Sequence, residues 1–401
     1  MYIQQETLFS FEEILKFQPQ TKLQIIVNEL DLSNLIRLLS KNPRKRGPKG
    51  HFPKSLILSL VAMAVEQIPY LTSLVERLQQ DPVFRVTCGF DILSKPPSLS
   101  TFSRFLTRLE KTQCLKGEFH QLILQANDLG IIGGESVAID ATDINSYEKA
   151  VPQTKVESSP NAPDWGSKKG TDGKRKHWFG YKVHLIVDCK SGLPLEALTT
   201  PASWNDGIKE IVHPLIDNFL QDFTGILKPK FWILDKGYDN VHVYEHIVNV
   251  AKGFAIIPYN PRSEKAPPVG FNDKYQPICS MGYPLAFWGI DGDYLKYRCP
   301  HVVNNVDCPY GSKWCSDSNY GLCKKFNFKK EPRLYSYPPR ATDKWHQLYN
   351  LRNSIERCNN MLKNHLNLNN VRSKGTKKAH VFALLSCIAL MASSIAMSKA
   401  K

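Results

Sequence analysis

Four side chains near the C-terminus have the types and spacing to bind a phosphate and a metal ion from one side of a helix. In the stretch YNLRNSIERCNNMLKN they are Tyr349, Arg352, Glu356 and Lys363. Because a helix advances about 100° per residue, steps of three, four and seven place them within an arc of roughly 60°. The neighbouring arc is apolar and comprises Leu348, Leu351, Ile355, Leu362 and Leu366. The same pattern also fits an ordinary surface helix in which Arg352 and Glu356 form a weak pair.

Two aspartates earlier in the chain could complete a metal site with Glu356. Asp140 ends the apolar run VAID and Asp235 ends the apolar run WILD, so each is predicted at the end of a strand. Such hard oxygen ligands suit Mg²⁺ or Mn²⁺, and two ions together can activate a water or a 3′-hydroxyl and stabilise the leaving oxygen of a phosphodiester. Aspartates at strand ends are also common as turn residues, and Asp143 and Asp239 are close enough in the sequence to be alternative ligands.

The overall charge indicates a polyanionic partner. The chain of 401 residues has a formal net charge of +15, and nucleic acid is the commonest partner of so basic a protein. Its 42% hydrophobic content is typical of a globular protein with two or three domains. The N-terminus, MYIQQETLFSFEEILKF, has no basic start followed by an apolar run, so we expect a protein that stays in the cytoplasm.

The first 130 residues are predicted to be helical, with apolar periodicity in SLILSLVAMAVEQI and in TFSRFLTRLEKTQCLKGEFHQLILQAN. The segment SKPPSLS separates these two stretches and offers Ser100 as an N-cap. The segment KNPRKRGPKG, which contains Arg44, Lys45 and Arg46, cannot form a regular helix. It could be a basic arm that enters a DNA groove or a solvated linker.

From Gly134 onward, short apolar runs predict a mixed sheet. The runs are ESVAID, GYKVHLIVD, LPLEALTTPA, FWILD and FAIIPYN, and Ser191-Gly192 suits a tight turn between the second and third. Two helices are predicted between the later runs, the first with Asn205 and Asp206 available as caps. The expected order is strand, hairpin of two strands, helix, strand, helix, strand. Residues 260–340 lose this periodicity and form an insertion.

The segment AHVFALLSCIALMASSIAMS, Ala379 to Ser398, is long enough to span a membrane and has no charged residue. It is rich in Ala and Ser, contains His380 and is flanked by lysines, so we expect a core helix and no membrane.

The insertion contains cysteines that could ligate one Zn²⁺ ion, because soft thiolates suit zinc and the segment has few apolar residues. The candidate ligands are Cys299, Cys308, Cys315 and Cys323, with Cys279 and His301 as further candidates. The spacings are not those of a zinc ribbon, and free thiols are the alternative.

Further basic segments could bind DNA. In KKGTDGKRKHWFGYK, Trp178 or Phe179 could stack on a base, although a solvated loop leading into a strand fits equally well. Trp204 and Trp288 are treated as core residues. The last basic group, which follows the helix of the opening stretch, comprises Arg372, Lys374, Lys377 and Lys378.

Three motifs together resemble bacterial insertion-sequence transposases of the DDE class, which have an RNase H-like catalytic domain. The Y-x2-R-x3-E-x6-K signature of one subgroup matches Tyr349 to Lys363 at every spacing. AIDAT, with Asp140 and Thr142, resembles the first catalytic motif, and DKGYD, which starts at Asp235, resembles the second. HFPKSLILSLVAMA resembles the helical domain that precedes the catalytic domain in these proteins.

The resemblance implies a function and a set of roles. Asp140, Asp235 and Glu356 would bind two Mg²⁺ or Mn²⁺ ions, while Tyr349, Arg352 and Lys363 would contact transposon-end phosphates. The protein would cleave insertion-sequence ends and transfer them into target DNA, as a homodimer on paired terminal inverted repeats near the nucleoid. The alternative is a descendant that binds DNA without cutting it. The expected domains are a helical DNA-binding domain (1–130), a catalytic domain in two parts (131–259 and 341–401) and the cysteine-rich insertion (260–340).

Overall fold

The computed structural model describes residues 13, 17, 19–40, 50–156, 159–170, 173–262, 266–370 and 374–400. It contains two compact units, each built from separate stretches of the chain. Unit 1 comprises Met1–Ile131, Asp143–Tyr181 and Asn360–Lys401, and unit 2 comprises Ile132–Thr142 and Lys182–Asn359. The basic segment with Arg44, Lys45 and Arg46 lies outside the described residues, as does Arg372. Our division of the chain into four segments stays a prediction.

Unit 1 is largely helical, as its apolar periodicity predicts. Its N-terminal helices are α2 (Lys22–Asn28), α3 (Ser33–Ser40), α4 (Pro53–Val65), α5 (Leu71–Gln80), α6 (Pro82–Thr87), α7 (Leu99–Thr112) and α8 (Cys114–Asp128). The N-cap of α7 is Ser98, so the prediction of Ser100 is wrong by two residues. The chain turns sharply between α7 and α8 because Gln113 adopts a left-handed conformation with φ of 49°.

The long C-terminal helix α13 (Thr376–Lys399) is a core helix, as predicted. It packs against α8, α4, α7 and α2 within unit 1. Among the described residues it is the one helix long and apolar enough to cross a membrane, and 72% of its most apolar window is buried. Burial on every side explains why this helix has no polar face.

The central sheet has the predicted strands and one more. The predicted ones are β1 (Ser136–Asn145), β3 (Arg175–Asp188), β4 (Pro194–Pro201), β5 (Phe231–Leu234) and β6 (Phe254–Ile256). They follow the order β4–β3–β1–β5–β6, with β5 parallel to both β1 and β6. The additional strand β2 (Asp164–Lys169) pairs antiparallel with the first half of β3. This mixed sheet, with helices around it, has the RNase H-like fold.

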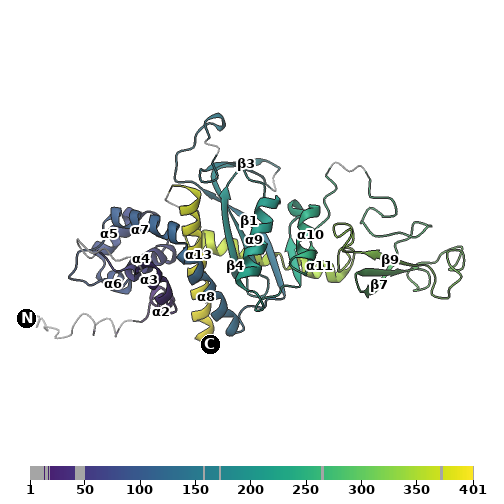
Figure 1. Cartoon of the computed structure of the whole chain (residues 1–401), viewed down its shortest axis with the longest axis horizontal. Helices are drawn as coiled ribbons and strands as arrows, with labels where there is room; N and C mark the ends of the chain where they lie inside the picture. The colour runs from purple at the N-terminus through teal and green to yellow at the C-terminus, as the bar shows by residue number, and fades with distance from the viewer. Residues whose placement is uncertain are drawn as a thin grey trace, which may run out of the picture. The chain divides into compact units, whose positions relative to one another are not determined.

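The sheet is buried at its centre and flanked by helices. β5 is buried along its whole length, as expected for a strand between two parallel neighbours. Helix α9 (Lys209–Asp222) lies alongside β4, and α10 (Val241–Asn249) packs on β6 and α9 (Figure 1). The N-cap of α9 is Ile208, so neither Asn205 nor Asp206 caps it as predicted.

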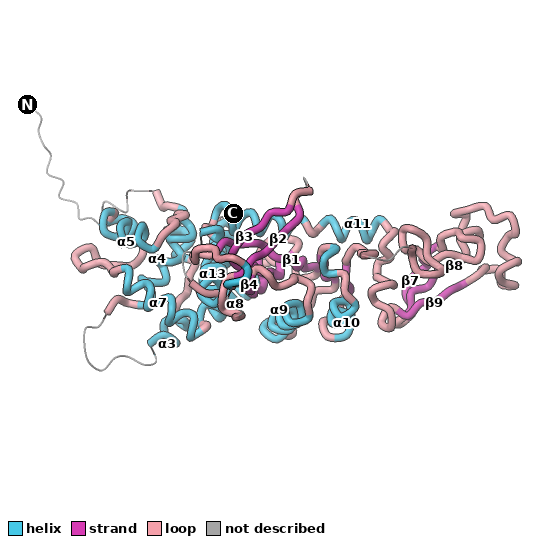
Figure 2. The backbone as a smooth tube through the Cα atoms, turned by 90° about the horizontal axis from the view of Figure 1, so that it is seen from above, coloured by secondary structure: helices cyan, strands magenta, loops and turns pink. Residues whose placement is uncertain are grey.

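The insertion forms a second sheet of three antiparallel strands. These are β7 (Ala286–Asp291), β8 (Tyr294–Arg298) and β9 (Cys323–Asn327), and they stand apart from the first sheet in Figure 2. A small cluster of mostly aromatic and aliphatic residues holds them together: Val248, Cys279, Leu285, Leu295, Tyr297 and Phe328. Val248 belongs to α10 and Phe254 of β6 packs against this cluster, so the small core of the insertion is shared with its neighbours in unit 2.

Several aromatic residues are placed differently from our predictions. Trp178 is buried, and its ring fills the space beside Gly166, where a Cβ would lie 2.3 Å from it. It therefore cannot stack on a base, and Phe179 instead contacts Trp165 with the ring centroids 5.5 Å apart. Trp288, which we expected in the core, is 57% exposed.

Candidate active site

The fold brings Asp140 and Asp235 to neighbouring positions in unit 2. β1 and β5 are parallel, and Ile139 lies opposite Leu234 in their register. Asp140 and Asp235 each follow that last pair, at the carboxyl end of the paired segment. Both aspartates are partly buried, and the residues directly before them are buried. Asp235 directly follows β5, as predicted, but Asp140 lies within β1, which continues to Asn145, so the prediction that Asp140 ends its strand is wrong.

Backbone amides fix one oxygen of each aspartate. Oδ1 of Asp140 accepts a hydrogen bond from the Ala141 amide at 2.8 Å. Oδ1 of Asp235 accepts one from the Gly237 amide at 2.7 Å and caps the short 3₁₀ helix Lys236–Tyr238. These bonds set the orientation of both carboxylates.

Arg352 joins the first aspartate to the glutamate of the signature. Its Nη1 lies 3.3 Å from Asp140 Oδ2, and its Nη2 donates to Glu356 Oε1 at 2.6 Å. Desolvation opposes the shift, but the charges around it, led by Asp140, raise the pKa of Arg352. The guanidinium therefore stays charged and partly neutralises these carboxylates.

Tyr349 lies beside the same group. Its ring stacks on Trp345, with centroids 5.1 Å apart and planes inclined by 14°. Burial, together with the nearby charges of Asp235 and Asp140, raises the pKa of Tyr349, although Arg352 acts in the opposite direction. Four of the predicted site residues around Arg352 therefore come together in unit 2.

The predicted continuous helix is wrong, because the chain breaks at Leu351 and Arg352. The structure has α11 (Asp343–Asn350), α12 (Asn353–Asn360) and a π-helical turn, Met361–His365. Around the break, amides bond to carbonyls three residues earlier, such as Arg352 to Tyr349 and Ile355 to Arg352. Such tight turns advance about 120° per residue instead of 100°. Leu351 is therefore 39% exposed rather than on the apolar side.

Lys363 has a different partner, Asp143, in unit 1. Its Nζ donates to the Asp143 carbonyl at 2.7 Å and lies 3.3 Å from Asp143 Oδ1. Burial alone would raise the pKa of Asp143, but the charge and hydrogen bond of Lys363 lower it. Asp143 is thus ion-paired.

Asp239, the second alternative ligand, is a structural residue. It is 1% exposed and accepts hydrogen bonds from Tyr244 Oη at 2.7 Å, the Asn260 amide at 2.8 Å and Arg333 Nη2 at 3.0 Å. A buried carboxylate with these partners is not available to a metal ion in solvent.

Tyr238 was not among the predicted site residues, although the charges of both aspartates act on its phenol. Tyr238 is fully buried, and desolvation followed by the charges of Asp206, Asp140 and Asp235 raises its pKa well above the usual value. Asp206, which we expected as a helix cap, instead pairs with Lys182 at 2.9 Å. The one available signal was the position of Tyr238 inside DKGYD.

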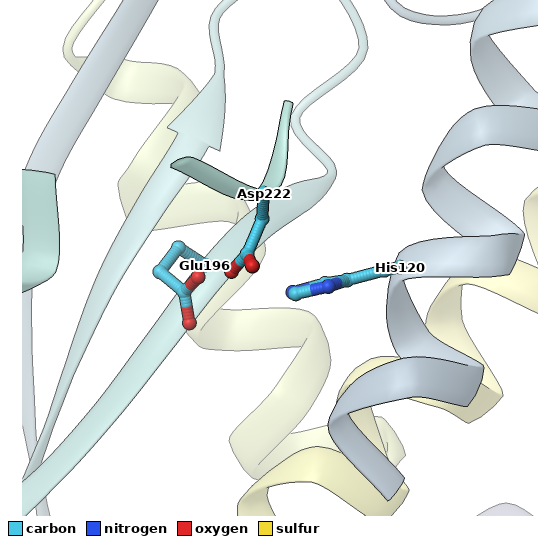
Figure 3. Close-up of side chains that lie close together, drawn as sticks. All are labelled: His120, Glu196 and Asp222. Atoms are coloured by element: carbon cyan, nitrogen blue, oxygen red, sulfur yellow. The ribbon is translucent and has the colours of Figure 1, made fainter. Parts of the chain in front are cut away.

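Unit 2 contains a second acidic pair that the sequence did not indicate. Glu196 on β4 and Asp222 at the end of α9 have carboxylate oxygens within 4.8 Å of each other. Figure 3 shows their side chains pointing toward one another; it also labels His120, which belongs to unit 1. Their strand and helix lie in contact.

Asp140, Asp235 and Glu356 fit a Mg²⁺ or Mn²⁺ site by their donor chemistry, since all three offer carboxylate oxygens. They are not all within 4.8 Å of one another, and Arg352 is bonded to two of them. Metal binding at this site would therefore require Arg352 to release at least one carboxylate.

Comparison with known proteins finds transposase families. The profile described as "Transposase DDE domain" matches residues 133–392, and "Transposase domain (DUF772)" matches residues 11–108. No curated protein matches the chain. A similar solved structure is the cryo-EM structure of the piggyBac transposase synaptic complex with hairpin DNA, which has 11% sequence identity and a TM-score of 0.42. That match covers 94% of this chain and 74% of the other.

The DDE profile spans well over half of the chain, including Asp140, Asp235 and Glu356. Such domains define a group of phosphodiester-cleaving transposases that use divalent metal ions. This chain belongs to the transposase DDE domain family.

Proposed function

We propose that this protein is a DNA transposase that cuts at insertion-sequence ends and transfers them into target DNA. The observation that carries the proposal is the placement of Asp140 and Asp235 directly after the last paired residues of the adjacent parallel strands β1 and β5, with Arg352 bonded to both Asp140 and Glu356. No other chemistry suits three carboxylates and an arginine in so basic a chain as well as phosphoryl transfer.

Asp140, Asp235 and Glu356 would hold two Mg²⁺ or Mn²⁺ ions, which would activate the attacking oxygen and stabilise the leaving oxygen. A water oxygen attacks phosphorus at the element's end, and the bond to the 3′-oxygen breaks. The resulting 3′-hydroxyl oxygen then attacks phosphorus in a phosphodiester of target DNA, and the bond from that phosphorus to the target strand's own 3′-oxygen breaks. Arg352 can donate two parallel bonds to a phosphate once it leaves the carboxylates, and Tyr349 lies beside it.

Surface charge supplies DNA affinity away from the site. The β2–β3 hairpin exposes Lys174, Arg175 and Lys176. Lys374 before α13 and Lys377 in its first turn are also exposed. We assign phosphate contacts to these residues and to Lys363, and a groove contact to the segment with Arg44, Lys45 and Arg46. The N-terminal helices would recognise terminal inverted repeats, in a homodimer that works at the nucleoid.

A cleavage assay with the full-length protein tests this proposal. The substrate is double-stranded DNA that carries the short inverted repeats flanking the gene, incubated with Mg²⁺ or with EDTA. We expect wild-type protein to cut at the repeat boundary in Mg²⁺ only, and Glu356→Ala to bind the same DNA without cutting. Cutting that persists in EDTA would contradict the metal-dependent mechanism.

A non-catalytic DNA-binding descendant is the second candidate. It is favoured by the Arg352 bonds to Asp140 and Glu356, because they already neutralise two of the metal ligands. Repeat DNA bound by wild type but left uncut in both Mg²⁺ and Mn²⁺ would support this candidate.

A further inference from the structure

The structure does not support the zinc site that we predicted in the insertion. Thiolate ligands of one Zn²⁺ ion, with Zn–S bonds of about 2.3 Å, have sulfur atoms about 3.8 Å apart. Among the described residues, no three of Cys299, Cys308, Cys315 and Cys323 have their sulfur atoms within 4.8 Å of one another, and Cys323 is exposed. A different group of residues in unit 2 has the chemistry of a ligand site.

An open pocket of about 470 Å³ lies where α9 and α10 begin. Two of the residues that line it carry a full positive charge: Lys209, in the first turn of α9, and Arg262, which follows β6. Its other polar side chains belong to His242, Asn205, Asn240 and Asn260. No aspartate or glutamate is among the described residues that line it. Positive charge without a lining carboxylate suits an anionic ligand.

The loops before the two helices meet at this pocket. The Gly207 amide donates to Asn205 Oδ1 at 3.1 Å, and the Gly207 carbonyl accepts a bond from Asn240 Nδ2 at 3.3 Å. A Cβ at Gly207 would lie 3.0 Å from the Gly237 carbonyl oxygen, so the absence of a side chain permits this close approach. The first turns of both helices therefore border the same pocket.

Neither helix uses a side chain to cap its first amides. The N-cap residues are Ile208 for α9 and Asn240 for α10, and neither side chain bonds to an amide of the first turn. The first amides of a helix have no partner within the helix and lie at the positive end of its dipole. These amides add hydrogen-bond donors to the two charged side chains, and phosphate oxygens suit such donors.

The charges of Lys209 and Arg262 are not compensated by carboxylates. Lys209 is exposed, and it forms no ion pair within the part of the chain that the structure describes. Arg262 donates through Nη2 to the Asp239 carbonyl at 2.9 Å and to Asn240 Oδ1 at 2.5 Å. Both acceptors are neutral, so these bonds hold the guanidinium in place and leave its charge available to a ligand.

The acidic residues near the pocket leave it positively charged. Asp206 pairs with Lys182 at 2.9 Å, and the buried Asp239 carboxylate pairs with Arg333 at 3.0 Å. Glu210 is the third, and its charge acts on His242. Because Glu210 is exposed, solvent screens its charge.

The pocket adjoins the candidate active site through the DKGYD motif. Gly237 lines the pocket, and its amide donates to Asp235 Oδ1 at 2.7 Å. Asn260, another lining residue, donates to the Lys236 carbonyl at 3.4 Å. A DNA strand with its reacting phosphate at Asp235 would therefore bring a neighbouring phosphate to the pocket.

We propose that this pocket binds one phosphate group of the DNA backbone, next to the phosphate at which the candidate active site acts. The inference rests on the proposed function. Lys209 and Arg262 supply the positive charge, and the first amides of α9 and α10 supply neutral donors. A contact of this kind positions the DNA strand without reading its sequence.

Equilibrium binding of the full-length protein to a random-sequence DNA duplex in EDTA tests the pocket separately from cleavage. Phosphate contacts need no repeat sequence, and EDTA prevents metal-dependent cutting. We expect Lys209→Gln and Arg262→Gln each to weaken binding about tenfold and to reduce the slope of log K against log salt by about one. Lys209→Arg should restore both, which shows that charge and not folding is responsible.

The matched control is Lys228→Gln, an exposed lysine at the opposite end of β5 from Asp235. It should bind DNA as wild type does. Unchanged affinity and slope in both pocket variants, or an equal loss in Lys228→Gln, would overturn the proposal.

Neutral linkages in the DNA identify the bound phosphate. A methylphosphonate, which has no charge, replaces one phosphate at a time in a duplex that carries the inverted repeat. Wild type should lose about tenfold in affinity at one position beside the cleavage boundary, and Arg262→Gln should lose little there, because its contact is already gone. Equal losses in both proteins at every position would refute the assignment.

Two further outcomes separate this inference from its alternatives. Tight binding of inorganic phosphate that leaves DNA affinity unchanged would show that the pocket takes a free anion, and would overturn the proposal. Binding data that follow our expectations, without any cutting of repeat DNA in Mg²⁺ or Mn²⁺, would support the phosphate pocket and refute the proposed enzyme.

Discussion

The sheet that carries the aspartates and the insertion that follows it are stabilised in different ways. The strands before Asp140 and Asp235 are buried and apolar. The insertion instead exposes Trp288 and holds Arg298 over its ring at 4.3 Å. Burial of apolar side chains stabilises the first region. The edge of its sheet can therefore carry charged residues that serve chemistry. The second region has only a small buried cluster and depends more on polar and aromatic contacts.

One buried ion pair joins the two regions. Arg333 of the insertion bonds to Asp239, which follows the strand that ends at Asp235. Arg340 adds bonds to Tyr244 Oη at 2.9 Å and to the Ile257 carbonyl at 3.0 Å. The two aspartates of DKGYD therefore have different roles. Asp235 lies at the candidate site, and Asp239 binds Arg333 of the insertion.

The largest effect should come from removing the glutamate of the candidate site. We expect Glu356→Ala to lower the cleavage rate by about a thousandfold, because a metal ligand supplies several kcal/mol of transition-state stabilisation. Its side chain is 56% exposed, so the unfolding midpoint should hardly change. Rates on repeat DNA are compared with those of Glu245→Ala, an exposed glutamate on α10. Cleavage by Glu356→Ala within tenfold of wild type would remove Glu356 from the site.

Substitution of the two aspartates of DKGYD should affect different properties: stability for Asp239 and cleavage for Asp235. Asp239→Ala should lower the free energy of unfolding by about 3 kcal/mol, because it leaves Arg333 without its buried partner. Asp235→Asn retains a capping side chain, so it should change stability by less than about 1 kcal/mol while abolishing cleavage. Urea unfolding and cleavage assays on both variants separate the roles. Equal destabilisation by the two changes would contradict the comparison.

A pH-dependent effect should appear at the Lys363–Asp143 pair of unit 1. Because the folded pKa of Asp143 is lowered from 3.8, the pair stabilises the fold above that value and the contribution is lost as pH falls through the folded pKa. Lys363→Met should therefore cost about 1 kcal/mol at neutral pH and less in acid. Thermal unfolding near pH 7 and near pH 3 measures this. Lys176→Met is the control, since its exposed amine lies farther from Asp143, at 3.8 Å. An unchanged difference at the two pH values would argue against the pair.

The smallest effect is expected on the insertion surface. Arg298→Ala removes contacts with the rings of Trp288 and Tyr320, the second at 5.0 Å. We expect a loss of about 1 kcal/mol in unfolding free energy, with normal cleavage. Lys325→Ala, which removes only an exposed pair with Asp291, should change stability less. A larger loss of stability for Lys325→Ala than for Arg298→Ala would show that charge pairs, and not ring contacts, stabilise this sheet.

The sequence by itself determined the elements that depend on local pattern. Apolar runs of strand length predicted β1 and β5, and Asp235 directly follows β5 as expected, because a buried run must end where the chain reaches solvent. Asp140 ends the apolar run but not the strand, since β1 continues to Asn145. The continuous apolarity of residues 379–398 predicted the core helix α13 for the same reason. The signature spacing selected Tyr349, Arg352 and Glu356, which do lie close to the aspartates.

The tertiary structure decided which of several similar residues does what. Asp143 and Asp239 resemble Asp140 and Asp235 in sequence, but their lysine and arginine partners come from more than ninety residues away. Partners so distant along the chain leave no mark in local periodicity. The ion pairs of Asp143 and Asp239 could therefore be identified only from the folded structure.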